Sequence, residues 1–108
     1  MKAETFGLRA SDLREITQIL QKFEGIYEAI LFGSRAKGNF SHGSDVDIAI
    51  VGDIDFKDFL HLRYLLNEES MMPYSFDVVV YQDIQNQKLE EHIDRIGICI
   101  YECGKVLS

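Results

Sequence analysis

Short apolar runs and longer stretches of helical periodicity alternate along the chain. Runs at 26–32, 46–51 and 76–81 are short and rich in β-branched and aromatic residues, which predicts a strand at each. The run at 46–51 (VDIAIV) is almost wholly apolar after its acid, as expected for a strand covered on both faces. A fourth run, GICIYE at 97–102, predicts a short edge strand.

Helices are predicted before, between and after these strands, where apolar residues recur at spacings of three and four. We expect Ser11 to cap the first helix. Its apolar face carries Leu13, Ile16, Leu20 and Phe23. The segment 56–66 predicts a strongly buried helix. A further helix is predicted at 87–96. This order of elements predicts an α/β chain of the α+β type, with helices packed on a small mixed sheet of three or four strands.

Length and charge narrow the class of protein. The chain has 108 residues and is 46% apolar, which is enough for a single domain, 1–108, with its own core. The net charge of −7 disfavours general nucleic-acid binding, because no basic face is available for a phosphate backbone. No stretch approaches the roughly 20 apolar residues of a membrane span. The first residues lack the apolar core of a signal peptide, so we expect a cytoplasmic protein.

The cysteines and two of the histidines carry no recognisable metal pattern. Cys99 and Cys103 lack the further Cys or His ligands of a zinc site, so we expect reduced thiols. A catalytic cysteine is disfavoured because no candidate base lies nearby. His61 and His92 fall in predicted helices without metal-ligand spacing.

Three aspartates stand where strands usually exclude acids. Asp45 and Asp47 lie at the mouth of the strand 46–51, and Asp77 lies within 76–81. Alternate residues share a strand face, so on neighbouring strands the three carboxylates can meet. Unit charges about 4 Å apart repel by roughly 4 kcal/mol at an effective dielectric of about 20, which favours a bound Mg²⁺. Asp45 alone could instead bond its own glycine–serine turn.

A glycine–serine loop follows the first predicted strand. Gly33 and Ser34 precede a predicted short helix at 34–37. Glycine lets a phosphate approach the backbone, and the Ser34 hydroxyl and the free N–H groups of a helix start can bind it. Arg35 and Lys37 could reach the same phosphate. The Walker A and dinucleotide glycine patterns are both absent.

The combined motif is similar to a known signature. The stretch GSRAKGNFSHGSDVDIAI at 33–50 resembles that of the DNA polymerase beta-type nucleotidyltransferase superfamily, in which Gly-Ser and a short helix precede Asp-x-Asp. The small size and the GSRAKG…SDVD form resemble the minimal nucleotidyltransferase (MNT) group. The resemblance spans a motif core at 26–81 and implies the nucleotidyltransferase fold.

The resemblance also implies a role for each motif residue. Gly33 and Ser34 would hold the β- and γ-phosphates of a nucleoside triphosphate. Asp45 and Asp47 would bind two Mg²⁺ ions. Asp77 would complete the metal site and help to deprotonate the attacking hydroxyl. The three aspartates are therefore the predicted catalytic residues and metal ligands.

The implied activity is transfer of a nucleoside monophosphate, AMP from ATP by the resemblance, to an acceptor hydroxyl with release of pyrophosphate. Larger superfamily members carry a second domain that grips the acceptor, and this chain has no such segment. We therefore expect the acceptor on a separate molecule, or a cleft completed by a second subunit in a homo-oligomer. MNT proteins commonly pair with a small helical HEPN partner, and the MNT chain acts as antitoxin by transferring AMP to a tyrosine of that partner. The segment 56–66 has enough apolar surface to form such an interface.

Two alternatives stay open at this point. The enzyme could modify a small hydroxylated molecule, although the lack of an acceptor domain disfavours this. The chain could instead be a non-catalytic subunit that binds a nucleotide or a partner, although a lapsed site has no reason to keep three clustered acids. Replacing Asp47 by Asn separates catalysis from binding.

Overall fold

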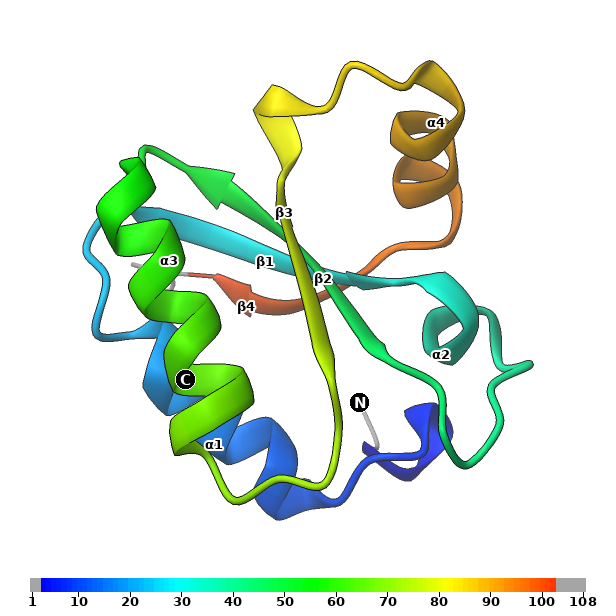
Figure 1. Cartoon of the computed structure of the whole chain (residues 1–108). Helices are drawn as coiled ribbons and strands as arrows, with labels where there is room; N and C mark the ends of the chain where they lie inside the picture. Colours follow the sequence, from blue (N-terminus) through cyan, green and yellow to red (C-terminus); the bar gives the residue numbers. More distant parts are fainter. Residues whose placement is uncertain (1–2, 103–108) are drawn as a thin grey trace.

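Four strands form one mixed sheet in the order β3-β2-β1-β4, within the described residues 3–102 of this computed structural model (Figure 1). They are β1 (Ile26–Phe32), β2 (Val46–Gly52), β3 (Phe76–Val80) and β4 (Ile98–Glu102). β1 pairs antiparallel with both β2 and β4, whereas β2 and β3 run parallel. The predicted small mixed sheet is confirmed, and β4 is one of its edges.

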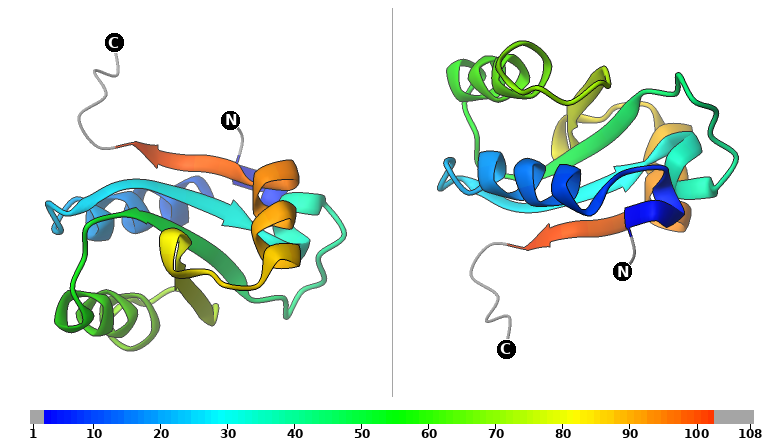
Figure 2. Two further views of the ribbon diagram at one scale, coloured as in Figure 1. Left: turned by 90° about the horizontal axis from the view of Figure 1, so that it is seen from above. Right: turned by 90° about the horizontal axis from the view of Figure 1, so that it is seen from below.

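Helices cover both faces of this sheet. The α-helices are α1 (Ala10–Leu20), α2 (Gly33–Lys37), α3 (Phe56–Tyr64) and α4 (Gln87–Ile96). Shorter helical turns are η1 (Ala3–Phe6) and η3 (Tyr81–Asp83), both 3₁₀, and the π turn η2 (Leu65–Glu69). α1 and α3 lie on one side of the strands and α4 on the other (Figure 1). α2 and α4 lie side by side at one end of the sheet (Figure 2).

Side-chain alternation along β2 separates the two cores. Val46 and Ile48 are fully buried in the main core, which also contains residues of α1 and α3. Ala49 faces the opposite way and packs in a smaller core with Ile93 of α4. Asp47 lies between Val46 and Ile48, so alternation places its side chain on the α4 side of the sheet.

The start of α1 differs from the sequence prediction. Ser11 lies inside the helix, which begins at Ala10. The backbone N–H of Arg9 instead donates to the carboxylate of Asp12 at 2.9 Å. The side chain of Asp12, in the first turn, thus accepts from a backbone N–H at the helix start. The sequence predicts the capping of this helix start by Ser11 instead.

The segment predicted as a strongly buried helix, 56–66, is buried on one side and exposed on the other. Its residues in the main core include Leu62, Leu65 and Leu66. On the outer side, Phe56, Leu60 and Tyr64 are 73%, 44% and 54% exposed. These exposed positions are spaced four residues apart, so they form one apolar stripe along α3. The predicted burial therefore holds for the inner side of this helix, and the outer side carries exposed apolar surface.

Two smaller expectations concern membranes and thiols. Among residues 3–102, no helix is both long enough and apolar enough to span a membrane. Cys99 is a free thiol on β4 that donates to the carbonyl of Tyr101 at 3.4 Å. Cys103 lies outside the described residues.

Candidate active site

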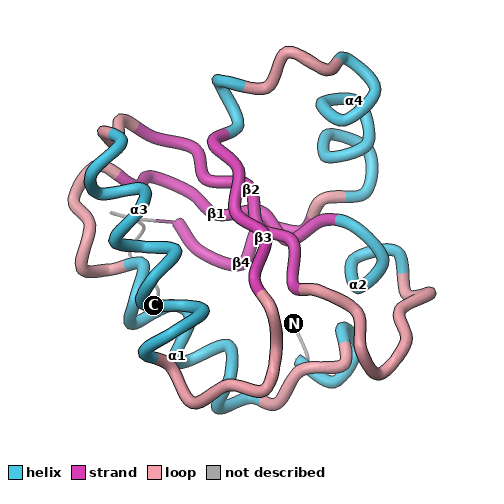
Figure 3. Tube along the Cα trace, in the orientation of Figure 1, coloured by secondary structure: helices cyan, strands magenta, loops and turns pink. Residues whose placement is uncertain are grey.

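The parallel pairing of β2 and β3 brings two of the predicted aspartates together. Asp47 and Asp77 are register partners on these strands. Asp45 lies just before β2. Figure 3 shows the loop that leads from α2 to this strand. Asp47 is half-buried, whereas Asp45 and Asp77 are exposed. The two strands that carry the acids are therefore neighbours, which is the condition under which the three carboxylates could meet.

Electrostatic repulsion links the three aspartates. Burial, followed by the charges of Asp77 and Asp45, raises the pKa of Asp47 from 3.8 to about 6, although the positive charge of Arg35 opposes this. The ionised Asp47 carboxylate is therefore held in an unfavourable environment. A cation among these oxygens would relieve both the desolvation and the repulsion.

Asn67 of η2 holds the edge strand β3 in place. Its side-chain oxygen accepts from the backbone N–H of Phe76 at 2.7 Å, and its amide donates to the Phe76 carbonyl at 3.1 Å. These bonds satisfy backbone groups on the outer side of β3, where an edge strand has no neighbour. Because Phe76 directly precedes Asp77, Asn67 fixes the backbone from which the Asp77 carboxylate projects.

Gly33 lies directly against the central aspartate. Its φ angle is 76°, in the left-handed region that favours glycine. A Cβ atom at this position would overlap the carboxylate of Asp47. The residue before Gly33, Phe32, is also the register partner of Asp47 across β1 and β2. The glycine therefore allows the predicted phosphate loop and the predicted metal ligand to come into contact.

Ser34 and Lys37, on the short helix α2, differ in their exposure to solvent. Ser34 is half-buried, and its backbone carbonyl accepts from the N–H groups of Gly38 and Asn39. None of residues 3–102 hydrogen-bonds the Ser34 hydroxyl, so it is available to a ligand. Lys37 is exposed at the end of α2. Phosphate binding by Ser34 and Lys37 stays a prediction.

Arg35 is buried and does not face the site. Its side chain is 2% exposed. Its guanidinium donates to the carbonyls of Phe6 (2.9 Å), Gly7 (3.2 Å) and Ser44 (2.8 Å). It also lies over the rings of Phe40 and Tyr74, 5.4 and 5.1 Å from their centroids. The predicted nucleotide contact of Arg35 is therefore wrong: the side chain ties the segment before Asp45 to the N-terminal turn.

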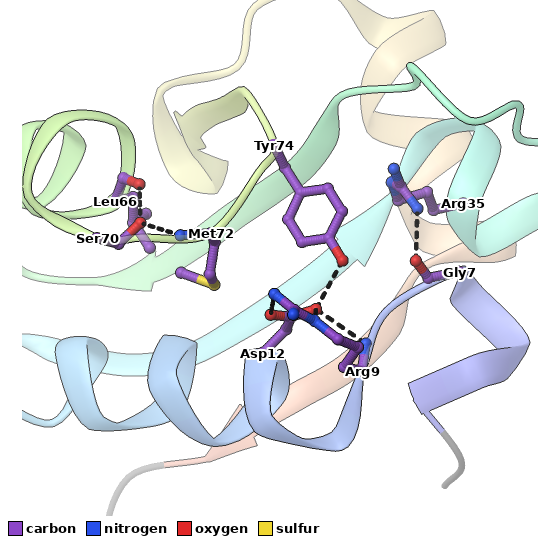
Figure 4. Close-up of polar contacts among 8 residues, drawn as sticks. All are labelled: Gly7, Arg9, Asp12, Arg35, Leu66, Ser70, Met72 and Tyr74. Atoms are coloured by element: carbon purple, nitrogen blue, oxygen red, sulfur yellow. Dashed lines mark hydrogen bonds and ion pairs between the residues drawn. The ribbon is translucent and has the colours of Figure 1, made fainter.

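A polar cluster beneath Arg35 supports this arrangement. The Tyr74 hydroxyl donates to Asp12 at 2.6 Å, and Asp12 also accepts from the Arg9 guanidinium at 2.9 Å (Figure 4). Burial works to raise the pKa of Asp12, but the hydrogen bonds from Arg9 and Tyr74 outweigh it and lower that pKa. The cluster connects α1 to the loop before β3, and Tyr74 stacks beneath Arg35.

His92 of α4 reaches the glycine–serine turn, which the sequence did not indicate. Its Nε2 accepts from the backbone N–H of Gly33 at 3.2 Å. Its ring meets that of Phe32 edge-to-face, with centroids 6.2 Å apart. His92 follows the turn by 59 residues, and its spacing shows no motif. Only the packing of α4 beside α2 brings the two together.

A different trio of potential ligands lies on the same sheet near β4. Among residues 3–102, the group of metal-ligand side chains whose donor atoms all lie within 4.8 Å of one another is Glu28, Cys99 and Glu102. The three predicted aspartates are spread more widely than this. Burial, and then the hydrogen bond to Glu102, raises the pKa of Cys99 to about 11, so its thiol is protonated and is a poor ligand.

Comparison with known proteins agrees with this geometry. The sequence matches the family described as Polymerase beta, Nucleotidyltransferase over residues 14–105. A chain of Methanocaldococcus jannaschii named "Putative protein adenylyltransferase" is 32% identical over 75 residues. The alignment covers 68% of this chain and 69% of that one.

Solved structures share the fold. A chain in a toxin–antitoxin crystal structure with AMP-PNP superposes with a TM-score of 0.70 at 21% identity, covering 86% of this chain and 75% of that one. A chain in the toxin–antitoxin MntA–HepT structure superposes with a TM-score of 0.65 at 18% identity, covering 87% and 73%. At such identities the likeness is one of fold.

Proposed function

The chain belongs to the polymerase beta nucleotidyltransferase family, and we propose that it transfers AMP from ATP to a hydroxyl of a separate partner protein. That the chain is a transferase of nucleotidyl groups follows from the family and from the adenylyltransferase relative. The proposal adds the donor and the acceptor. The observation that carries it is the pairing of Asp47 with Asp77 beside the Gly33–Ser34 turn.

The chemistry of the three aspartates fits divalent cations. Carboxylate oxygens are the ligands that Mg²⁺ prefers, and nucleotidyltransferases generally use divalent metals. The raised pKa of Asp47 shows that its charge has too little compensation from the protein itself. Asp45, Asp47 and Asp77 would hold two Mg²⁺ ions, which when bound stabilise the attacking and leaving oxygens.

The residues around the aspartates would orient the nucleotide. The close approach of Gly33 to Asp47 puts the glycine–serine turn next to the ligand carboxylates. The Ser34 hydroxyl and N–H would bind the β- and γ-phosphates, and the exposed Lys37 would add a charge from the end of α2. These groups recognise phosphate, which all nucleoside triphosphates share, so ATP is proposed from the family resemblance and the named relative.

The proposed reaction is an in-line displacement at the α-phosphorus. The acceptor hydroxyl oxygen forms a bond to this phosphorus as the bond to the bridging oxygen of the β-phosphate breaks, releasing pyrophosphate. The exposed Asp77 carboxylate, opposite Asp47, would take the hydroxyl proton. Transfer of that proton in the transition state is the role of a general base.

A protein acceptor is supported by the solved toxin–antitoxin structures with this fold. We infer a small helical partner of the HEPN type, with this chain as the antitoxin that adenylylates a partner tyrosine. The apolar stripe on α3, formed by Phe56, Leu60 and Tyr64, offers a surface for such a partner.

The test is thermal unfolding of wild type and Asp47→Asn with ATP, GTP, CTP or UTP, each with and without Mg²⁺. A nucleotide at about 100 times its Kd should stabilise the wild type by about 2.7 kcal/mol. We expect this stabilisation to need Mg²⁺ and to be absent in Asp47→Asn. Labelled AMP on a captured partner protein, dependent on Asp47, then establishes transfer.

The same experiment separates the alternatives. Nucleotide stabilisation that survives Asp47→Asn would contradict the metal assignment. Nucleotide binding without label on any protein, but with consumption of ATP when hydroxylated compounds are added, would point to a small-molecule acceptor. Binding of nucleotide and partner with no transfer would identify a non-catalytic subunit.

A further inference from the structure

We propose that His92 is a positioning residue of the nucleotide site, holding the Gly33–Ser34 turn against Asp47. This role rests on the proposed function, because it gives the turn a nucleotide to bind. Among residues 3–102, the hydrogen bond of His92 goes to the backbone of Gly33 and not to an aspartate, so its role is exerted through Gly33.

The contacts of His92 define one orientation of its ring. Nε2 accepts from the Gly33 N–H at 3.2 Å. In a neutral imidazole that accepts at Nε2, the proton is on Nδ1. The ring also meets Phe32 edge-to-face, with an interplanar angle of 82°. Two consecutive residues at the end of β1 and the start of α2 therefore fix the imidazole.

His92 belongs to the helix α4, which packs on the sheet. The next residue along α4, Ile93, is 2% exposed and belongs to a small core with Phe32 and Ala49. α4 begins with a capped turn, in which Asn86 accepts from two backbone N–H groups. In Figure 2, α4 lies alongside α2 at the same end of the sheet. The imidazole thus belongs to a helix that is anchored on the sheet.

Gly33 is consequently held from two directions. Its N–H is bound by His92, while its Cα packs so closely on Asp47 that a Cβ atom would overlap the carboxylate. Any rotation of the peptide before Gly33 would break the first contact and displace the second. Because the Gly33 N–H is already paired, phosphate binding falls to the Ser34 N–H and hydroxyl. His92 therefore sets the distance between the phosphate-binding groups of Ser34, its N–H and hydroxyl, and the proposed metal ligand Asp47.

The first test needs no variant. Long-range ¹H–¹⁵N spectra of the wild type at alkaline pH should show the neutral imidazole of His92 protonated at Nδ1 and bare at Nε2. Protonation at Nε2 would overturn the inference, because that nitrogen could not then accept from Gly33.

The second test compares variants by their Kd for MgATP. His92→Phe keeps a ring against Phe32 but removes the acceptor, whereas His92→Gln keeps an acceptor at a similar reach. His61→Phe is the matched control, since His61 also makes an edge-to-face contact, with Phe23, but sits on α3 across the sheet. We expect about tenfold weaker binding for His92→Phe, partial recovery for His92→Gln, and no change for His61→Phe.

The outcomes distinguish this inference from the proposed function. If the wild type binds MgATP, Asp47→Asn does not, and His92→Phe binds as the wild type does, the role of His92 is overturned alone. Equal weakening in His92→Phe and His92→Gln would also overturn it, because the acceptor atom would then be irrelevant. If the wild type itself does not bind MgATP, the proposed function fails and this role fails with it.

Discussion

Asp47 and Asp77 are register partners on the parallel strands β2 and β3, and each is an acid in a position that strands normally fill with apolar residues. Their side chains lie on the α4 side of the sheet, opposite the main core. The arrangement costs stability, because burial and repulsion both raise the pKa of Asp47. Such a pair does not serve stability, and the proposed binding of a cation would account for it.

Removing the central charge should stabilise the protein in the absence of divalent cations. The folded-state pKa of Asp47, about 6, lies above its ordinary 3.8, so the folded protein holds an extra proton between these values. Wild-type stability should therefore fall as pH rises through this window, with the loss complete above about pH 6. At pH 7, Asp47→Asn should gain about 1 kcal/mol, after discounting for the half-exposed position. Urea unfolding in EDTA from pH 4 to 8 measures this, and parallel curves for the two proteins would contradict it.

Alanine at Gly33 should damage the site more than alanine at Gly38. Both glycines have left-handed φ angles, 76° and 88°, so each substitution should cost about 1–2 kcal/mol of backbone strain. A Cβ atom at Gly38 meets nothing within 4 Å, whereas one at Gly33 overlaps Asp47. We expect only Gly33→Ala to lose more stability than this and to abolish stabilisation by MgATP. Melting temperatures with and without MgATP decide it, and equal behaviour of the two variants would exclude a special role for Gly33.

Substitution of Arg35 should lower the stability of the fold, whereas substitution of Lys37 should affect only the binding of MgATP. Arg35→Met leaves three backbone carbonyls without their charged donor and should destabilise the fold by about 3 kcal/mol or more. Lys37→Met, at an exposed position, should change stability by less than about 0.5 kcal/mol. If Lys37 binds phosphate, its variant should still weaken MgATP binding several-fold. Chemical denaturation and calorimetric titration measure the two effects, and an Arg35→Met protein of wild-type stability would refute the structural role.

The apolar stripe on α3 should be needed for transfer to the partner but not for folding. Leu60→Asp places a charge on an exposed position and should leave stability within about 0.5 kcal/mol of wild type. The matched change Leu62→Ala, on the buried side, should cost about 2–5 kcal/mol. We expect Leu60→Asp to bind MgATP normally while labelled AMP no longer appears on the captured partner. Unchanged labelling would place the partner elsewhere on the protein.

Much of the site was predictable because it depends on residues that are close together in the sequence. A strand's side chains alternate by backbone geometry alone, so VDIAIV already separates Asp47 from its apolar neighbours. The glycine–serine turn directly follows β1, and the order of strands and helices follows from periodicity. The family motif at 33–50 rests on the same short-range spacing, and the match over residues 14–105 agrees with it.

Tertiary packing decided the rest. The chain's own pattern shows neither that β3 pairs parallel with β2, which brings Asp77 beside Asp47, nor that α4 packs beside α2, which brings His92 to Gly33. Arg35 illustrates the limit most clearly: its place after Gly-Ser suggests a phosphate ligand, but three distant carbonyls and two aromatic rings bury it. Local sequence determines which side of an element a residue occupies, whereas its partners depend on contacts between segments that are far apart in the chain.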